Sequence, residues 1–168
     1  SAESDDWARA LGLFAQAKTM QPVNQTAVDG HALAQTITTT QDTLATYLLA
    51  PQRLSSPNVS AMAKKAITLA RPLEFFSPSL VAMTGRLVQE IALYETKIPV
   101  QVISDGQTSV AVRGVGRVGV VTSKTISLKP GRYAFEGKRA GYKSVLVWLE
   151  ISPGQSDVQV RIVCNEQI

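Results

Sequence analysis

The sequence predicts an α+β protein in which a helical region comes first and an all-β sandwich follows. Apolar residues recur every three or four positions through residue 96, which is the period of a helix, and they alternate from Ile98 onward, which is the period of a strand. Charge changes at the same place. Residues 1–96 carry 7 Lys and Arg against 8 Asp and Glu, and residues 97–168 carry 10 against 5. We therefore expect two domains, 1–96 and 97–168.

Prolines divide the first region into about four expected helices. Pro22, Pro51 and Pro72 each follow a stretch of helical periodicity, and Ser77-Pro78 is typical of a helix start, with serine as the N-cap and proline at the first helical position. The apolar stripes that we expect to face a core are, in chain order, Trp7, Ala10, Leu11, Phe14 and Ala17; Leu33, Ile37, Leu44, Tyr47 and Leu48; Met62, Ala66, Leu69 and Leu73; and Leu80, Leu87, Ile91 and Tyr94.

One segment of the helical region carries a repeat-like pattern. Phe14, Ala17 and Pro22 have the spacing of the residues that close a tetratricopeptide repeat, so residues 14–24 resemble the end of such a repeat. The match covers half a repeat, and no period of about 34 residues follows it. An ordinary antiparallel helical hairpin explains the same residues, and both alternatives stay open.

The second region has the pattern of a β-sandwich or small barrel of about six or seven strands. Asp105-Gly106 favours a tight hairpin turn between the first two alternating stretches. Lys129-Pro130-Gly131-Arg132 is expected to turn the chain between two later ones, since proline fixes φ and glycine supplies a positive φ. The alternating stretches are VQVIS, QTSVAVR, KTISL, RYAFEG, KSVLVWLEI and DVQVRIV.

The stretch KSVLVWLEI is apolar on both faces until Glu150. Val145, Val147, Leu149 and Ile151 share one face, and Leu146 and Trp148 share the other. A second apolar face needs a cover, so we expect Trp148 to be mostly buried, against the helical region or against a partner.

From Leu128 onward the chain reads L-x-PG-x-Y-x-F-x-G-x-x-x-GY-x-x-V and is followed by a strand, Pro153-Gly154 and a last strand. This order of turns and strands resembles the PEGA domain. The resemblance covers roughly residues 98–164, although PGRY stands where the motif that names the family would be. It implies a small β-sandwich in a bacterial surface or extracytoplasmic protein. The expected location is therefore periplasmic or otherwise extracytoplasmic, in part of a larger or membrane-anchored envelope protein.

No catalytic residue, metal site or cofactor is expected. Residues Gly114–Gly119 read GVGRVG, but a dinucleotide site needs a helix after the third glycine, and a strand pattern follows instead. These glycines are better explained by a bulged strand that crosses between sheets. His31 and Cys164 are the sole His and Cys, carboxylates after residue 97 are scattered, and Cys164 is expected to be a small buried side chain.

A binding role remains, through a groove between helices or through the basic face of the sandwich. The leading hypothesis is a non-enzymatic interaction or scaffold module whose partner is an envelope protein or a cell-wall glycan. The alternative is a cytoplasmic nucleic-acid or polyanion-binding protein that uses the basic second domain. The candidate binding residues are Arg132, Lys138, Arg139, Tyr142, Lys143 and Trp148.

Overall fold

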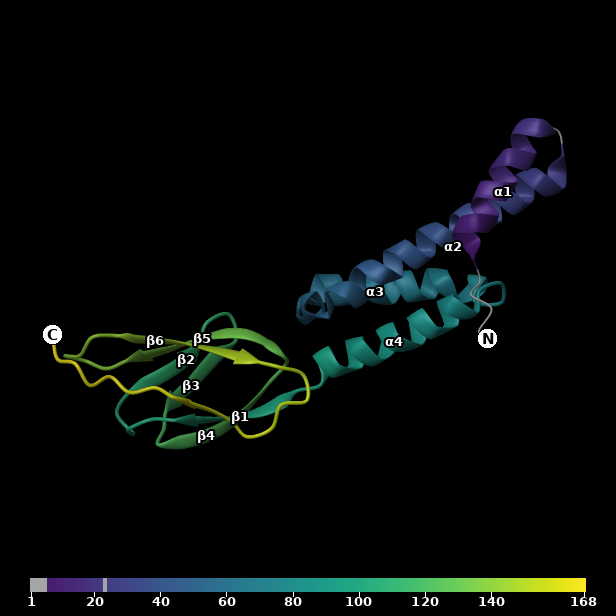
Figure 1. Ribbon diagram of the computed structural model, residues 1–168. Helices are drawn as coiled ribbons and strands as arrows, with labels where there is room; N and C mark the ends of the chain where they lie inside the picture. Colours follow the sequence, from purple (N-terminus) through teal and green to yellow (C-terminus); the bar gives the residue numbers. More distant parts are fainter. Residues whose placement is uncertain (1–5, 23) are drawn as a thin grey trace. The chain divides into compact units, whose positions relative to one another are not determined.

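The computed structural model describes residues 6–22 and 24–168, and it divides into two compact units (Figure 1). The helical unit is Ser1–Ile91 and the β unit is Ala92–Ile168. The division falls inside the last helix, which ends at Glu95, shortly before the first strand begins at Ile98. In the described part of the chain, no helix is both long and apolar enough to cross a membrane.

The described residues form four α-helices, as the prolines predict. They are α1 (Trp7–Met20), α2 (Gln25–Leu49), α3 (Pro57–Ala70) and α4 (Pro78–Glu95). Short 3₁₀ turns at Pro51–Ser55 and Arg71–Leu73 follow α2 and α3. Side chains cap three of the helix starts: the backbone N–H groups of Arg9, Ala27 and Leu80 donate to Asp6, Asn24 and Ser77.

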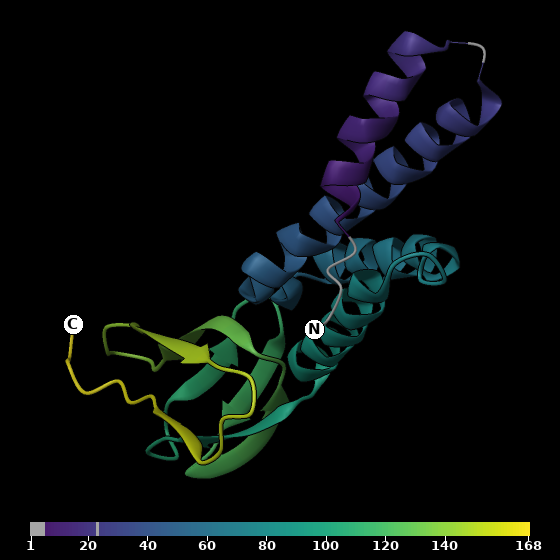
Figure 2. The same cartoon turned by 45° about the vertical axis from the view of Figure 1, so that its right-hand side comes forward.

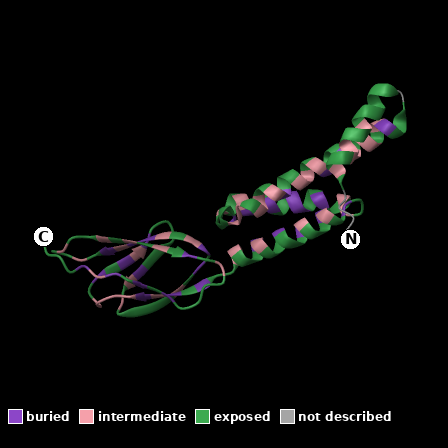
Figure 3. Ribbon diagram, in the orientation of Figure 1, coloured by how far each residue is buried: buried purple, intermediate pink, exposed green. Residues whose placement is uncertain are grey.

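Helices α1 and α2 form an antiparallel hairpin and lie side by side in both views (Figures 1 and 2). The ring of Phe14 lies directly on Gly30, where a β-carbon would come within 2.4 Å of a ring carbon. No described residue of α1 is fully buried, so this helix is coloured as exposed or intermediate along its length (Figure 3). The hairpin fits the simpler explanation for Phe14, whereas Ala17, which was expected to face the core, is exposed, and the repeat resemblance remains a prediction.

The expected apolar stripe of α3 is wrong in part. Met62 and Leu69 are 62% and 64% exposed, whereas the buried residues of this helix are mostly small. Alanines let helices approach closely, so the buried stripe runs along them and the larger side chains lie at its border. The stripe of α4 is confirmed for Leu80, Leu87 and Ile91. The buried residues of α3 are Ser60, Ala63, Ala66, Ile67 and Ala70.

The β unit is a two-sheet sandwich of seven strands. One sheet has the order β4-β1-β7 and the other β3-β2-β5-β6. Both contribute to one apolar core, which contains Val100 and Val102 from the first sheet and Val110 and Phe135 from the second. The strands are β1 (Ile98–Ile103), β2 (Ser109–Val112), β3 (Gly116–Val120), β4 (Ser123–Leu128), β5 (Gly131–Lys138), β6 (Val145–Ile151) and β7 (Val158–Arg161).

The expected hairpin at Asp105-Gly106 is wrong, because β1 and β2 lie in different sheets. The carboxylate of Asp105 accepts hydrogen bonds from the backbone N–H groups of Gln107 and Thr108, at 2.9 and 2.7 Å, and these bonds turn the chain into the second sheet. The local turn chemistry is therefore the expected one, but the strand that follows finds its partners elsewhere.

The glycine-rich segment forms β3, a strand that the alternation pattern misses. The pairing of β2 with β3 shifts register between Val110 and Ala111, which face Gly119 and Arg117, so Val118 has no partner of its own. This is the predicted bulge. The chain then crosses from β3 in one sheet to β4 in the other, also as predicted.

The inner side of β5 is packed too closely for a side chain at Gly137. A β-carbon there would lie 2.7 Å from a methyl of Ile162 and 3.0 Å from a methyl of Thr108. The hydroxyl of Thr108 donates to Asp105 and accepts the backbone N–H of Cys164. Cys164 is fully buried, as expected. This cluster ties the turn after β1 to the segment after β7.

Candidate interaction surfaces

The turn between β5 and β6 positions two of the candidate residues against each other. Gly141 has a φ of 76°, and the N–H of Tyr142 donates to the carbonyl of Arg139, which closes the turn. The guanidinium carbon of Arg139 lies 4.0 Å from the centre of the Tyr142 ring. Its Nη1 also lies 3.5 Å from an oxygen of Asp105. Arg139 therefore packs between an aromatic ring and a carboxylate.

Asp105 keeps its negative charge over a wide pH range. The backbone N–H groups of Gln107 and Thr108 stabilise its ionised form and lower its pKa to about 2. The carboxylate that faces Arg139 is thus charged at any pH at which the fold is ordinarily studied.

The other two cations near this turn also have carboxylate partners. Lys138 lies 3.2 Å from an oxygen of Glu136, and Lys143 pairs with Glu166. Arg113 lies 3.4 Å from the same oxygen of Glu136. The hydrogen bond from Lys138, followed by the one from Arg113, holds the pKa of Glu136 below its usual value. Each candidate cation of the turn is therefore partly neutralised.

Trp148 and Arg132 form a second cluster on the outward face of β5 and β6. Within the β unit nothing covers Trp148, which is 56% exposed, or its neighbour Leu146, which is 43% exposed, so the expected burial of Trp148 against the helical region or a partner stays a prediction. The guanidinium carbon of Arg132 lies 4.5 Å from the centre of the Trp148 ring. A cation stacked on an aromatic ring keeps both side chains in a defined position at a surface.

The six candidate residues do not form one patch. Arg132 lies near the start of β5 and Lys138 at its end, so the two are separated by roughly 20 Å along the strand. We call the first group the Trp148 cluster (Arg132, Leu146 and Trp148) and the second the turn cluster (Lys138, Arg139, Tyr142 and Lys143). Sequence reasoning missed the carboxylates that pair with the turn cluster. Glu136 and Lys138 are two residues apart on one strand, so their side chains lie on the same face. This spacing could have predicted that Glu136 pairs with Lys138.

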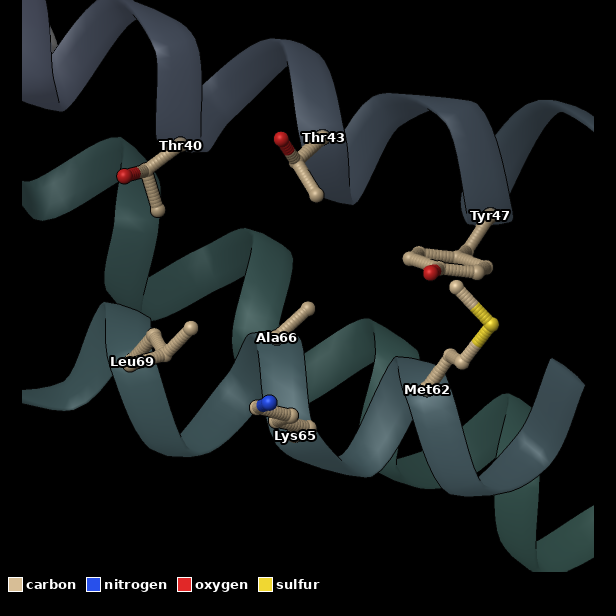
Figure 4. A pocket seen from close by; sticks show the side chains of 7 residues that line it. All are labelled: Thr40, Thr43, Tyr47, Met62, Lys65, Ala66 and Leu69. Atoms are coloured by element: carbon tan, nitrogen blue, oxygen red, sulfur yellow. The ribbon is translucent and has the colours of Figure 1, made fainter. Parts of the chain in front are cut away.

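A groove between α2 and α3 is the third candidate surface (Figure 4). It has a volume of about 320 Å³. Tyr47 of α2 and Met62 of α3 point toward one another across it, and Lys65 lies along its α3 side (Figure 4). The large α3 side chains that the sequence placed in the core are thus the walls of this groove. Its lining residues are Thr40, Thr43, Tyr47, Met62, Lys65, Ala66 and Leu69.

Comparison with known proteins gives no relative from which a role could be transferred, since no known family model and no curated protein matches the chain. Among the described residues, no group of three or more His, Cys, Asp and Glu side chains is placed to hold a metal ion. The candidate surfaces must therefore be judged by their own geometry.

Proposed function

We propose that this protein is a non-enzymatic interaction module that binds through the outward face of β5 and β6, around the Trp148 cluster. The observation that supports this most is the position of Trp148, a 56% exposed tryptophan held under an arginine on a regular strand. Tryptophan and arginine are the residues that most often dominate the free energy of protein–protein binding. A large ring that is already fixed in place also loses little entropy when it is covered.

The proposed partner is an envelope protein or a cell-wall glycan. This part of the proposal is based on the resemblance to the PEGA domain, which implies that the chain belongs to the extracytoplasmic part of a larger or membrane-anchored bacterial protein. An aromatic ring flanked by Leu146 and Arg132 presents an apolar surface with a polar border, which suits either kind of partner.

Binding to nucleic acid is the less favoured alternative. Lys138, Arg139 and Lys143 each lie within ion-pair distance of a carboxylate, so a phosphate would have to compete with groups already in place. A protein that binds through several phosphate contacts loses affinity steeply between about 50 and 200 mM salt, whereas a contact built on Trp148 and aliphatic residues changes little.

The test is cosedimentation of the purified chain with isolated cell-wall material, together with capture of purified envelope proteins, at both salt concentrations. Trp148→Ala should weaken binding by about tenfold or more, which is the range of interface hot spots. Phe75→Ala is the matched control, because Phe75 is an aromatic residue of the helical unit and is 89% exposed. Binding that Trp148→Ala leaves unchanged would contradict the proposal. Salt-sensitive binding to DNA or RNA that is lost when Lys138, Arg139 and Lys143 are replaced would establish the alternative.

A further inference from the structure

Strand β6 is an edge strand with little protection. It ends the sheet β3-β2-β5-β6, and within the described residues its backbone makes no hydrogen bond outside that sheet. Exposed edges of natural sheets are usually short, bulged, covered, or guarded by charged side chains, lysine above all, or by proline. The seven residues of β6, VLVWLEI, include no lysine, arginine or proline, and Glu150 is their one charged residue.

The other three edges of the sandwich are protected. β3 is bulged and carries Arg117. β4 carries Lys124, whose ammonium group donates to the carbonyl of Val118 at 3.0 Å. β7 has four residues and ends in Arg161. Because the same chain guards these edges and leaves β6 open, the open edge calls for an explanation of its own.

The hydrogen-bond pattern shows which backbone groups of β6 face outward. In an antiparallel strand the N–H and C=O of one residue point to the same side, and the side alternates along the strand. The carbonyl of Ala134 accepts from Arg113, so the even-numbered residues of β5 face β2 and the odd-numbered ones face β6. Their register partners on β6 are also odd-numbered. The outward groups therefore belong to Leu146, Trp148 and Glu150.

These three residues are self-complementary about Trp148. If a second β6 lies antiparallel with Trp148 opposite Trp148, then Leu146 of each copy lies opposite Glu150 of the other. This register uses every outward N–H and C=O of both strands, whereas a shift of two residues leaves some without partners. No like charges face each other, and Val147 lies opposite Leu149 on the inner face, which continues the core.

We propose that β6 is a self-association edge, at which two copies of this chain pair antiparallel and join their four-stranded sheets into one. The two-fold axis passes through Trp148, as a closed isologous dimer requires. This inference goes beyond the proposed function and does not depend on it, because it concerns the chain alone.

The first test is the mass of the full chain in solution, measured by sedimentation equilibrium without any partner. The mean mass should rise reversibly toward twice the chain mass over about a hundredfold range of concentration. Trp148→Lys would place two lysines opposite each other on the axis and should weaken self-association by at least about tenfold. Val120→Lys on the β3 edge is the matched control, since Val120 is 57% exposed. A parent chain that stays monomeric, or a Trp148→Lys variant that associates as strongly as the parent, would overturn the proposal.

The second test fixes the register and leaves Trp148 and Arg132 in place. The double variant Leu146→Cys with Glu150→Cys should form a covalent dimer on mild oxidation, because directly opposite residues of this kind have Cα atoms about 5.5 Å apart, which suits a disulfide. Each single variant should remain uncrosslinked, since its two cysteines would be roughly 14 Å apart along the strands. Cys164 is buried and adds no accessible thiol. A double variant that is folded by circular dichroism and crosslinks no faster than the single variants would refute this register and the dimer with it.

Discussion

Replacing Gly137 with alanine should destabilise the β unit, although alanine is ordinarily the better residue in a strand. The added β-carbon would lie 2.7 Å from the Ile162 methyl, 3.0 Å from the Thr108 methyl and 3.5 Å from the Cys164 sulfur. All three neighbours are fully buried, and two are β-branched, so they have little freedom to move. Since carbon atoms in contact sit about 3.5–4.0 Å apart, the Ile162 methyl would have to retreat by roughly 1 Å.

The expected loss follows from two opposing terms. Overpacking a filled core costs about 1–3 kcal/mol. Removing the excess backbone entropy of glycine in the unfolded chain returns about 0.5–1 kcal/mol. Because the added β-carbon would lie only 2.7 Å from the Ile162 methyl, the overpacking cost should fall in the upper part of its range, about 2–3 kcal/mol, and the net free energy of unfolding of the β unit should fall by about 1–2.5 kcal/mol.

Gly30→Ala is the matched control, and it should behave differently in spite of a shorter contact. The nearest atom to its added β-carbon is a ring carbon of Phe14, at 2.4 Å. Phe14 is only half-buried, on a helix whose described residues are never fully buried, so the ring can swing away. Alanine inside a helix gains about 1 kcal/mol over glycine, and the helical unit should keep its stability within about 0.5 kcal/mol or become more stable.

The two tryptophans allow each unit to be followed separately by fluorescence during urea unfolding. Trp7→Phe leaves only Trp148, which reports on the β unit, and Trp148→Phe leaves only Trp7, which reports on the helical unit. In the first background Gly137→Ala should lower the urea midpoint by about 0.5–1 M. A urea midpoint of Gly137→Ala at or above that of the parent would refute the packing argument. An equal loss of stability for Gly30→Ala would show that the contact distance alone determines the cost of the added methyl group.

Three further predictions concern the turn after β1, the unit boundary and Trp148. Asp105→Asn should destabilise the β unit at neutral pH. The folded-state pKa of Asp105 is about 2, below its ordinary 3.8, so the extra stability that the parent gains from this carboxylate is complete above about pH 4 and should disappear as the pH falls toward 2. Urea midpoints of parent and variant across this pH range would measure the difference. A fragment that starts at Lys97 should give the circular dichroism of a folded β protein, and an unfolded fragment would contradict the two-unit division. Trp148→Ala should lower the free energy of unfolding by about 0.5–1.5 kcal/mol, because the ring is half-exposed and stacks on one arginine. A loss of about 3–5 kcal/mol, which is typical of a buried tryptophan, would show that the ring is covered in solution.

The order of the helices and strands could be predicted because its signals are local. Prolines lie near the ends of α1, α2 and α3, and Ser77-Pro78 begins α4. The change of apolar period at Ile98 marks the first strand for the same reason. Each of these features depends on the steric properties of a few neighbouring residues, and these act in the same way in any fold.

The pairing of strands could not be predicted from such signals. Asp105-Gly106 makes a turn, but nothing in the dipeptide says whether the next strand stays in the same sheet. The alternation pattern does not show β3, because Gly116, Gly119 and the bulge hide the alternation of a strand only five residues long, and only the glycines indicated a strand there. The dense packing at Gly137 arises from Thr108 and Ile162, which come from distant parts of the sequence, so no local sequence pattern predicts it.

The candidate site shows the same limit. The sequence makes Arg139 and Tyr142 candidate binding residues, but it does not predict the stacking of one on the other. The pairing of Arg132 with Trp148 required knowing that β5 and β6 are neighbours in one sheet. Met62 and Leu69 line the groove of α2 and α3 because the buried stripe of α3 consists mostly of alanines.

The parallel pairing of β1 with β7 has a consequence for the order in which the chain acquires its structure. Val100 pairs with Val158, and the N–H of Ile162 donates to the carbonyl of Ile103, so the sheet β4-β1-β7 is incomplete until the residues after 157 have left the ribosome. The helical unit is built from contacts between nearby residues and is synthesised first. During translation it should fold early, while β1 waits with one side unpaired, so the slow, high-contact-order step and the period of greatest exposure to chaperones both belong to the β unit.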